Sequence, residues 1–100
     1  MEIRWSPEAA DDFEGAVRRI LEDNPSNAER VAQIIYDRVA ALPTFPNRGR
    51  AGRVEGTREL VIVPLPFIAV YRIKGETVEI VRVIHGAQEW PPKVQASPEE

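Results

Sequence analysis

One stretch of the chain holds its only histidine among other polar side chains that could do chemistry. It runs from Glu79 to Pro91, where a β-prone run ends at the only histidine, His85, with Gln88 and Trp90 close behind. An imidazole titrates near neutral pH and can act as a general acid or base. A strand end holds such side chains rigidly and leaves them exposed. We therefore expect a chemical or recognition centre here; the alternative is an ordinary edge strand whose histidine bonds to Gln88 or to backbone.

Three arginines on the expected strands are candidates to work with this histidine. Arg58, Arg72 and Arg82 could present fixed guanidinium forks to phosphates or to carboxylates. The competing interpretation is that they form cross-strand ion pairs, above all Arg72 with Glu79. Together with His85 they form the candidate catalytic set.

A second basic group lies in a glycine-rich segment. Arg48, Arg50 and Arg53 alternate with glycines, which predicts a loop that carries a mobile basic patch. The glycines match neither Gly-x-Gly-x-x-Gly nor a phosphate loop that ends in Gly-Lys-Ser/Thr. We therefore expect these arginines, with Gln88 and Trp90, to bind a nucleic acid or a protein partner electrostatically.

Composition excludes several classes of site. The chain has no cysteine and one histidine, so disulfides, thiol nucleophiles and the usual zinc sites are not expected, and a Ser–His hydrolase is unsupported. We expect no metal and no small-molecule cofactor. The start does not resemble a secretory signal, and the longest apolar stretch, 60–71, contains Pro64 and Pro66 and is too short to span a bilayer. The expectation is a cytoplasmic protein without membrane contact.

The net charge of −3 conceals a segregation of charge along the chain. Residues 1–46 carry five arginines against nine acids, net −4, whereas residues 47–85 carry six arginines and one lysine against four acids, net +3. The tail from Gly86 carries one lysine against three acids, net −2. A basic middle region of this kind predicts an acidic partner or a phosphate backbone.

Two helices should precede the basic region. Ser6 followed by Pro7 is typical of a helix N-terminus, and a capping box, Ser26-x-x-Glu29, predicts the start of a second helix after Asn24-Pro25. Apolar residues recur at three- and four-residue spacing in both, which predicts a buried stripe on each helix. The first stripe is Ala9, Ala10, Phe13, Ala16, Val17, Ile20 and Leu21, and the second is Ala28, Val31, Ala32, Ile35, Val39 and Leu42. So short a connection predicts an antiparallel hairpin.

Strands follow the helices. Residues 57–63 are a strand candidate, and residues 67–73 and 77–85 should form a β-hairpin. A two-residue Lys74-Gly75 loop would need a positive φ at Lys74, so we prefer a loop over 74–77, which pairs Arg72 with Glu79. That register also pairs Val70 with Val81 and Ile68 with Val83, and it puts His85 on the face that holds Arg72. Which face receives the helices is left open.

The order of these elements and three segments resemble the RelE/ParE superfamily of toxins from bacterial type II toxin–antitoxin systems. The segments are Gly52–Leu60, Phe67–Arg72 and Val81–Trp90. The resemblance covers residues 1–91, which we expect to be a single domain, with 92–100 as a flexible tail. It implies an α+β fold in which the N-terminal helical hairpin packs on a twisted antiparallel sheet of three to four strands.

The resemblance also implies a function. Such toxins are held inactive by a cognate antitoxin, and the growth inhibition that they cause can stabilise plasmids. ParE-like members block DNA gyrase, whereas RelE-like members enter the ribosome and cleave mRNA with arginines or lysines and, in several branches, a histidine or tyrosine near the last strand. The acidity of this chain and the absence of a tyrosine from the tail favour the ParE-like action, while His85 and the basic middle region favour the nuclease. A toxin-like chain that only binds its antitoxin is the third possibility.

Overall fold

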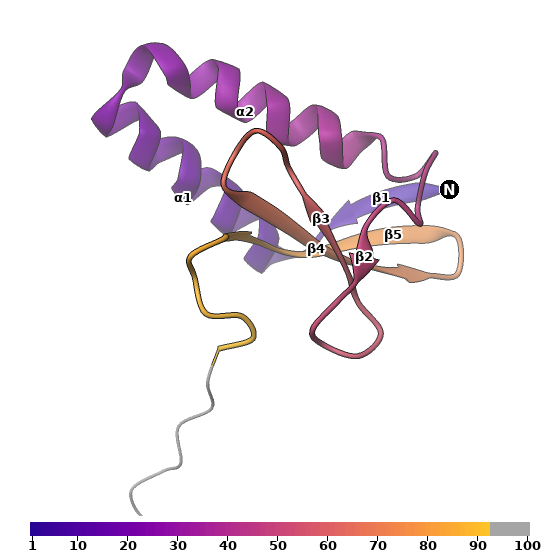
Figure 1. The fold of residues 1–100 in the computed structure, drawn as a ribbon. Helices are drawn as coiled ribbons and strands as arrows, with labels where there is room; N and C mark the ends of the chain where they lie inside the picture. Colours follow the sequence, from indigo (N-terminus) through magenta and orange to yellow (C-terminus); the bar gives the residue numbers. More distant parts are fainter. Residues whose placement is uncertain (93–100) are drawn as a thin grey trace, which may run out of the picture.

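The computed structural model describes residues 1–92, so residues 93–100 of the predicted tail lie outside the described part of the chain. A hairpin of two helices covers one face of a five-stranded sheet (Figure 1). The strands follow the order β1-β5-β4-β3-β2 across the sheet. The predicted α+β arrangement is confirmed.

Helix α1 spans Pro7–Asp23 and begins where the sequence predicts. The Ser6 hydroxyl accepts a hydrogen bond from the Ala9 N–H at 3.0 Å, and Pro7 fills the first helical position, where no N–H is needed. Ala9 is fully buried, and Phe13 and Ile20 pack against the core from the same stripe. Ala10 and Leu21, which the prediction also placed in this buried stripe, are exposed, because they lie on the side of α1 that neither the sheet nor α2 covers fully.

Helix α2 spans Pro25–Ala40 and begins two residues earlier than the capping box predicts, with Asn24 rather than Ser26 as its N-cap. The predicted capping box is wrong because Pro25 takes the first helical position, which makes Asn24 the N-cap. The Ser26 hydroxyl therefore does not cap the helix and donates a hydrogen bond to Asn24 Oδ1 at 3.0 Å. The Asn24 N–H also bonds to the Ile20 carbonyl at 2.7 Å, which ends α1 and makes the turn tight. The predicted antiparallel hairpin is confirmed, and the second stripe is buried at Ala28, Val31, Ile35, Val39 and Leu42.

The sheet has two edge strands beyond the three predicted from periodicity. Strand β1, Glu2–Trp5, pairs in parallel with β5, Thr77–His85, so the sheet is mixed rather than purely antiparallel. Strand β2 has only two residues, Arg50–Ala51, and pairs with β3, Arg58–Val61. Strand β4, Phe67–Lys74, lies between β3 and β5. Neither edge strand is long enough to show a pattern, since each depends on a distant partner for its hydrogen bonds.

The β4–β5 hairpin contains a bulge that the sequence did not predict. Arg72 pairs with Glu79 as expected, but Val81 is an extra residue on β5. Beyond it Val70 faces Arg82 and Ile68 faces Ile84, so the expected pairs of Val70 with Val81 and Ile68 with Val83 are wrong. The bulge coincides with the end of β1, where the Ser6 hydroxyl donates to the Val81 carbonyl at 2.9 Å. Each side chain after Val81 therefore changes face.

The helices pack on the face that carries Tyr71 and Ile80, which settles the question left open by the sequence. Both side chains are fully buried against Ile35 and Leu42, and each such burial contributes about 1.5–3 kcal/mol. The opposite face carries a smaller apolar cluster of Ile68, Val70 and Ile84, on which Val81 and Trp90 pack.

Candidate functional site

His85 ends β5 on the face of the sheet that the helices cover. Its ring stands edge-on to Phe67, with 5.6 Å between the ring centres, and its Nδ1 accepts a hydrogen bond from the Ala87 N–H at 3.0 Å. The neutral ring therefore carries its proton on Nε2. The backbone N–H of His85 donates to Gln88 Oε1 at 3.2 Å. The side chain is exposed and can exchange protons with a bound molecule.

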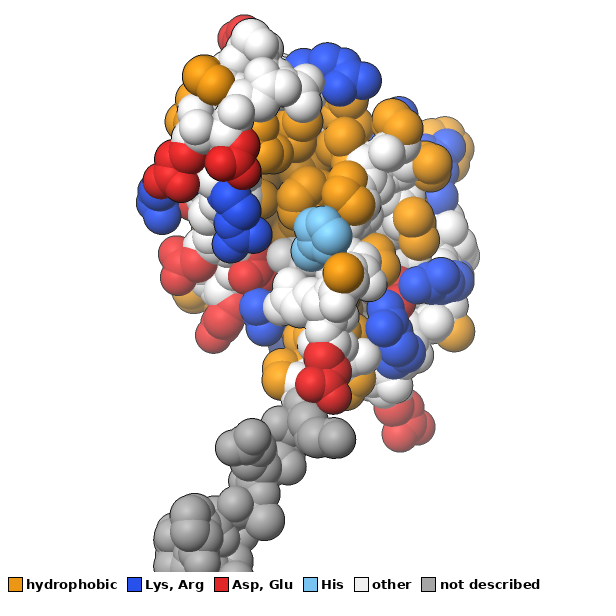
Figure 2. Space-filling model, turned by 60° about the vertical axis from the view of Figure 1, so that its left-hand side comes forward, with side chains coloured by type: hydrophobic (Ala, Val, Ile, Leu, Met, Phe, Trp, Pro, Cys, Tyr) orange, Lys and Arg blue, Asp and Glu red, His pale blue; other side chains and the backbone are white. Residues whose placement is uncertain are grey.

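A cleft of about 400 Å³, here called the His85 cleft, lies between α1 and the end of the sheet. Asp11, Asp12, Arg19 and Gln88 line it together with His85. It adjoins a hollow of about 340 Å³ that shares Arg19 and His85 and is otherwise largely apolar, and Figure 2 shows the histidine at the rim of this hydrophobic hollow. Arg19 is a cation that sequence reasoning missed, although its seven-residue spacing from Asp12 places both on one helix face.

Arg82 is held by a carboxylate of α1. Its Nε and Nη2 donate to Asp12 at 2.6 and 3.0 Å, and Asp12 Oδ2 also accepts the backbone N–H of Val83 at 2.9 Å. The hydrogen bonds from Asp12 raise the pKa of Arg82, against the opposing effect of burial. The guanidinium lies 5.6 Å from the centre of the Trp90 ring. Asp12 thus caps the edge of β5 beyond the end of β1, and the hydrogen bonds of Arg82 go to protein.

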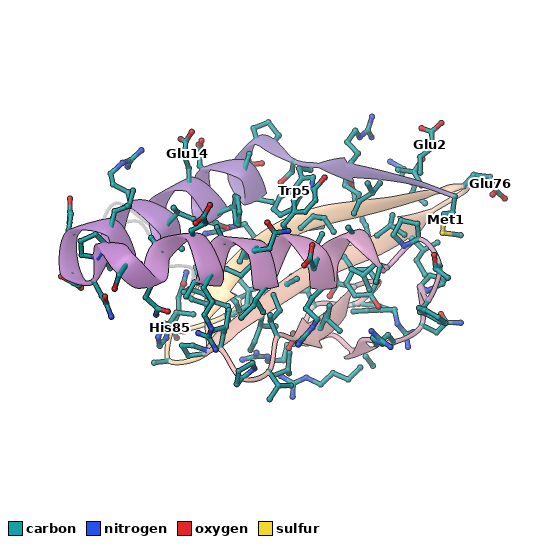
Figure 3. All side chains as sticks on the ribbon, turned by 90° about the horizontal axis from the view of Figure 1, so that it is seen from above. Met1, Glu2, Trp5, Glu14, Glu76 and His85 are labelled. Carbon is teal, nitrogen blue, oxygen red and sulfur yellow. The ribbon has the colours of Figure 1, made fainter. Side chains whose placement is uncertain are left out.

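Arg72 lies on the opposite face from His85, so the predicted shared face is wrong because the Val81 bulge reverses it. The predicted ion pair is confirmed: Arg72 Nε donates to Glu79 at 2.5 Å, and Arg4 approaches the same carboxylate at 3.8 Å. The hydrogen bond from Arg72 lowers the pKa of Glu79. Glu79 is six residues before His85, about 20 Å along the strand at 3.3 Å per residue. Figure 3 shows His85 and Glu76 at opposite ends of the molecule.

Glu59 organises the arginines that the sequence places in a mobile loop. It is 1% exposed, and it accepts hydrogen bonds from Arg50 Nη2 at 3.1 Å, the Arg53 N–H at 2.9 Å and Arg53 Nη2 at 3.0 Å. Burial favours a higher pKa, but the hydrogen bonds from Arg53 and Arg50 outweigh it and lower the pKa of Glu59 to about 2. This Glu59 cluster was not predicted, because the two residues of β2, which place Arg50 opposite Glu59, resemble a loop in the sequence.

The rest of the basic segment is fixed by Tyr71. Its hydroxyl donates to the Pro46 carbonyl at 2.6 Å and accepts the Gly49 N–H at 2.9 Å. A Cβ at position 49 would lie 2.7 Å from the tyrosine ring, so only glycine fits there. Arg48 stands 5.1 Å above the Phe45 ring. The predicted mobile patch is therefore an ordered surface.

Arg58 also lies away from the His85 cleft. Its Nη2 donates to the Asn47 carbonyl at 3.0 Å, which ties β3 to the same segment. Among the described residues, the four candidate catalytic side chains do not come together: Arg58, Arg72 and Arg82 each bond to a different part of the protein.

A family model of the ParE toxins of type II toxin–antitoxin systems, parDE, matches residues 3–90. The chain belongs to the ParE toxin family. Its partner is therefore expected to be an antitoxin, as the name of the system implies. In the part of the chain that the structure describes, no helix has both the length and the apolar character to cross a membrane.

Individual relatives are toxins as well. The protein Y4kP of Sinorhizobium fredii is 42% identical over 89 residues, which cover 89% of this chain and 92% of that protein. Toxin RelE2 of Caulobacter vibrioides is 31% identical over 87 residues, 87% of this chain and 97% of that protein. A structure of the chromosomal ParDE toxin–antitoxin system from P. aeruginosa superposes with a TM-score of 0.80 and 30% identity, over 85% of this chain and 95% of that one.

Proposed function

We propose that this ParE-family toxin arrests growth in the cytoplasm by binding and inhibiting an essential protein target, DNA gyrase, and that its antitoxin silences it. A toxin of this kind would stabilise a plasmid that encodes the pair. One observation carries the proposal: the arginines that would serve a nuclease already bond to other groups of the protein, namely Asp12, Glu79 and the Asn47 carbonyl.

Cleavage of RNA sets geometric demands that this arrangement does not favour. A base must reach the 2′-hydroxyl, an acid must reach the leaving oxygen, and a cation must hold the phosphate between them, all within about 3 Å. Arg72 lies on the other face of the sheet from His85. Arg82 already makes two hydrogen bonds to Asp12, and breaking them would leave a carboxylate unpaired next to the substrate phosphate.

The experiment is a supercoiling assay with purified DNA gyrase, relaxed plasmid and the toxin freed from its antitoxin. We expect loss of supercoiling activity that is the same for wild type and for the His85→Ala variant. The matched control is the toxin with its antitoxin restored, which should return gyrase to full activity. Gyrase that stays fully active at a large excess of toxin would overturn the proposal.

A ribosome-dependent mRNA endonuclease is the second candidate, because the His85 cleft holds an imidazole, the cation Arg19 and the carboxylate of Asp11 within one concave site. Arg19 would hold a phosphate there and His85 would move a proton. Primer extension on mRNA after toxin induction tests this directly. Cuts in phase with codons that disappear in His85→Ala and Arg19→Ala would replace the gyrase proposal with this one.

A further inference from the structure

The outer side of β1 is an open edge of the sheet. Among residues 1–92, β1 pairs with β5 on its inner side and no strand borders its outer side. The Glu2 N–H bonds to the Glu76 carbonyl at 2.8 Å, so the backbone groups of Glu2 face β5. Because successive residues of a paired strand alternate in direction, the N–H and C=O of Ile3 and Trp5 point outward. An outward row of donors and acceptors is a template for another strand.

The two charged residues of this edge have opposite signs. Glu2 and Arg4 are both exposed, and because they are two residues apart their side chains share one face of the sheet. Arg4 approaches Glu79 only at 3.8 Å and its side chain is 68% exposed, so it can bind a second carboxylate. Figure 3 shows the side chain of Glu2 pointing outward beside β1.

This spacing makes the edge complementary to itself in one register. When two copies of β1 pair antiparallel about Ile3, Glu2 of each copy lies directly across from Arg4 of the other. A parallel pairing in register would put Glu2 across from Glu2, and an antiparallel pairing shifted by two residues would put Glu2 or Arg4 across from its own equivalent. Like charges placed directly across from each other are destabilising, so the charges select the antiparallel register about Ile3.

The same register satisfies the backbone and the apolar side chain between the charges. Ile3 of the two copies would exchange both of their N–H···O bonds, while Glu2 and Arg4 would form the closer kind of pair, with Cα atoms about 4.5 Å apart. Ile3 packs against the core of its own copy but is only partly buried. The two Ile3 side chains would therefore cover each other on the helical side of the joined sheet.

We propose that this surface, which we call the β1 edge (Glu2, Ile3, Arg4 and Trp5), binds a second copy of the chain about a two-fold axis at Ile3. The two five-stranded sheets join into one continuous sheet, and Arg4 of each copy lies between its own Glu79 and Glu2 of the other copy. A second copy is the occupant that the charges select, because the two-fold axis supplies the complementary charge order without any further partner.

The inference does not depend on the identity of the toxin's target. The β1 edge shares no residue with the His85 cleft, so that cleft stays available in each copy. An interface built on four residues of each chain is small, so we expect a weak dimer with a dissociation constant in the micromolar range.

The test measures sedimentation of the full-length toxin, freed from its antitoxin, over a range of concentrations at low salt. Glu2→Arg places an arginine across from Arg4 of the second copy, and Arg4→Glu places a glutamate across from Glu2. Neither variant should associate with itself, but an equal mixture of the two restores opposite charges at both pairs. Glu22→Arg makes the same charge change at an exposed residue near the end of α1 farthest from β1 and is the matched control. Circular dichroism verifies that each variant is folded.

We expect Glu2→Arg and Arg4→Glu each to weaken self-association by about tenfold or more, since two attractive pairs become repulsive. The equal mixture should associate with a dissociation constant within about threefold of wild type, a result that a merely misfolded variant would not give. Glu22→Arg should stay within twofold of wild type. Hydrogen exchange at the Ile3 amide should slow as the concentration of wild-type toxin rises.

A wild type that remains monomeric at its highest soluble concentration would overturn the proposal. So would a dimer whose association is unchanged in both edge variants, or a mixture of the two variants that associates no better than either alone. Protection of the Ile3 amide that appears only when the antitoxin is bound would assign the β1 edge to the antitoxin, and the proposal would fail.

Discussion

At the β2 end of the sheet the polar side chains are locked to one another, whereas at the end of β5 they face an open cleft. Glu59 is buried and accepts hydrogen bonds from Arg50 and Arg53, and the Tyr71 hydroxyl accepts the N–H of Gly49 in the loop before β2. His85 is exposed, and among residues 1–92 its contacts are hydrogen bonds with its neighbours Ala87 and Gln88 and an edge-on contact with Phe67.

This difference separates two uses of charged residues. A fixed, dehydrated carboxylate holds arginines in defined positions, which suits the recognition of a partner's surface. An exposed imidazole next to a cleft retains freedom to exchange protons, which suits chemistry but does not by itself provide a phosphate clamp. Substitutions at the β2 end should therefore reduce the stability of the fold more than a substitution at His85.

The largest effect is expected at Glu59. Glu59→Gln removes the charge that Arg50 and Arg53 bind. The lowered pKa of Glu59 corresponds to a stabilisation of about 3 kcal/mol. We expect the free energy of unfolding to fall by about 2 kcal/mol, because both arginines are partly solvated and solvent screens the interaction. Thermal unfolding should show a melting temperature lower by about 10 °C. Glu55→Gln, an exposed change in the same loop, is the control and should melt with wild type. A Glu59→Gln variant that also melts with wild type would show that the cluster is not a fixed element.

The same carboxylate predicts how stability depends on pH. The pKa of Glu59 is lower in the folded state than its ordinary value of 4.5, so its contribution is present above pH 4.5 and is lost as the pH falls toward 2. Urea unfolding of wild type and Glu59→Gln at pH 5 and pH 3 should show the difference between their free energies of unfolding shrink by about half. A difference that stays constant would contradict the lowered pKa.

A smaller effect is expected at Tyr71. Tyr71→Phe leaves the Pro46 carbonyl and the Gly49 N–H without their bonds and should lower the free energy of unfolding by about 1–2 kcal/mol. Tyr36, which is 54% exposed, gives the control variant Tyr36→Phe, expected to be neutral. Faster hydrogen exchange at the Gly49 amide in Tyr71→Phe would show that the stability is lost in the loop that contains Gly49. Equal stabilities for the two variants would mean that the loop is held by something else.

The smallest effect on stability is expected at His85. His85→Ala removes an exposed ring and one short-range hydrogen bond, so urea unfolding should change by less than about 1 kcal/mol. A loss of unfolding free energy in His85→Ala as large as that in Glu59→Gln would contradict the difference between the two ends of the sheet.

Much of the fold follows from local sequence. The Ser6-Pro7 start, the second apolar stripe and the Arg72–Glu79 pair are each encoded within a few residues, and each is found in the structure. The first stripe is found in part, since Ala10 and Leu21 are exposed. The Val81 bulge is not, because it arises where β1 ends and Ser6 bonds across 75 positions of sequence. One extra residue in β5 was enough to move His85 to the face opposite Arg72.

The candidate site was harder to predict for a related reason. Asp12 and Glu59 look like surface acids in the sequence. In the structure Asp12 binds Arg82, which is 70 positions away, and Glu59 binds Arg50, which lies on the two-residue strand β2. Ion pairs of this kind depend on which elements become neighbours, and a single sequence does not specify that. Residue types therefore singled out the arginines as candidates, without showing which of them bond to other groups of the protein.

We propose above all that this toxin acts by binding a protein target and needs no proton transfer by His85. Supercoiling by DNA gyrase, measured over a range of concentrations of wild type and of His85→Ala, tests it most directly. We predict half-maximal inhibition at concentrations that agree within twofold. Inhibition that is lost in a folded His85→Ala variant, or a wild type without effect on gyrase that cuts mRNA instead, would contradict the claim.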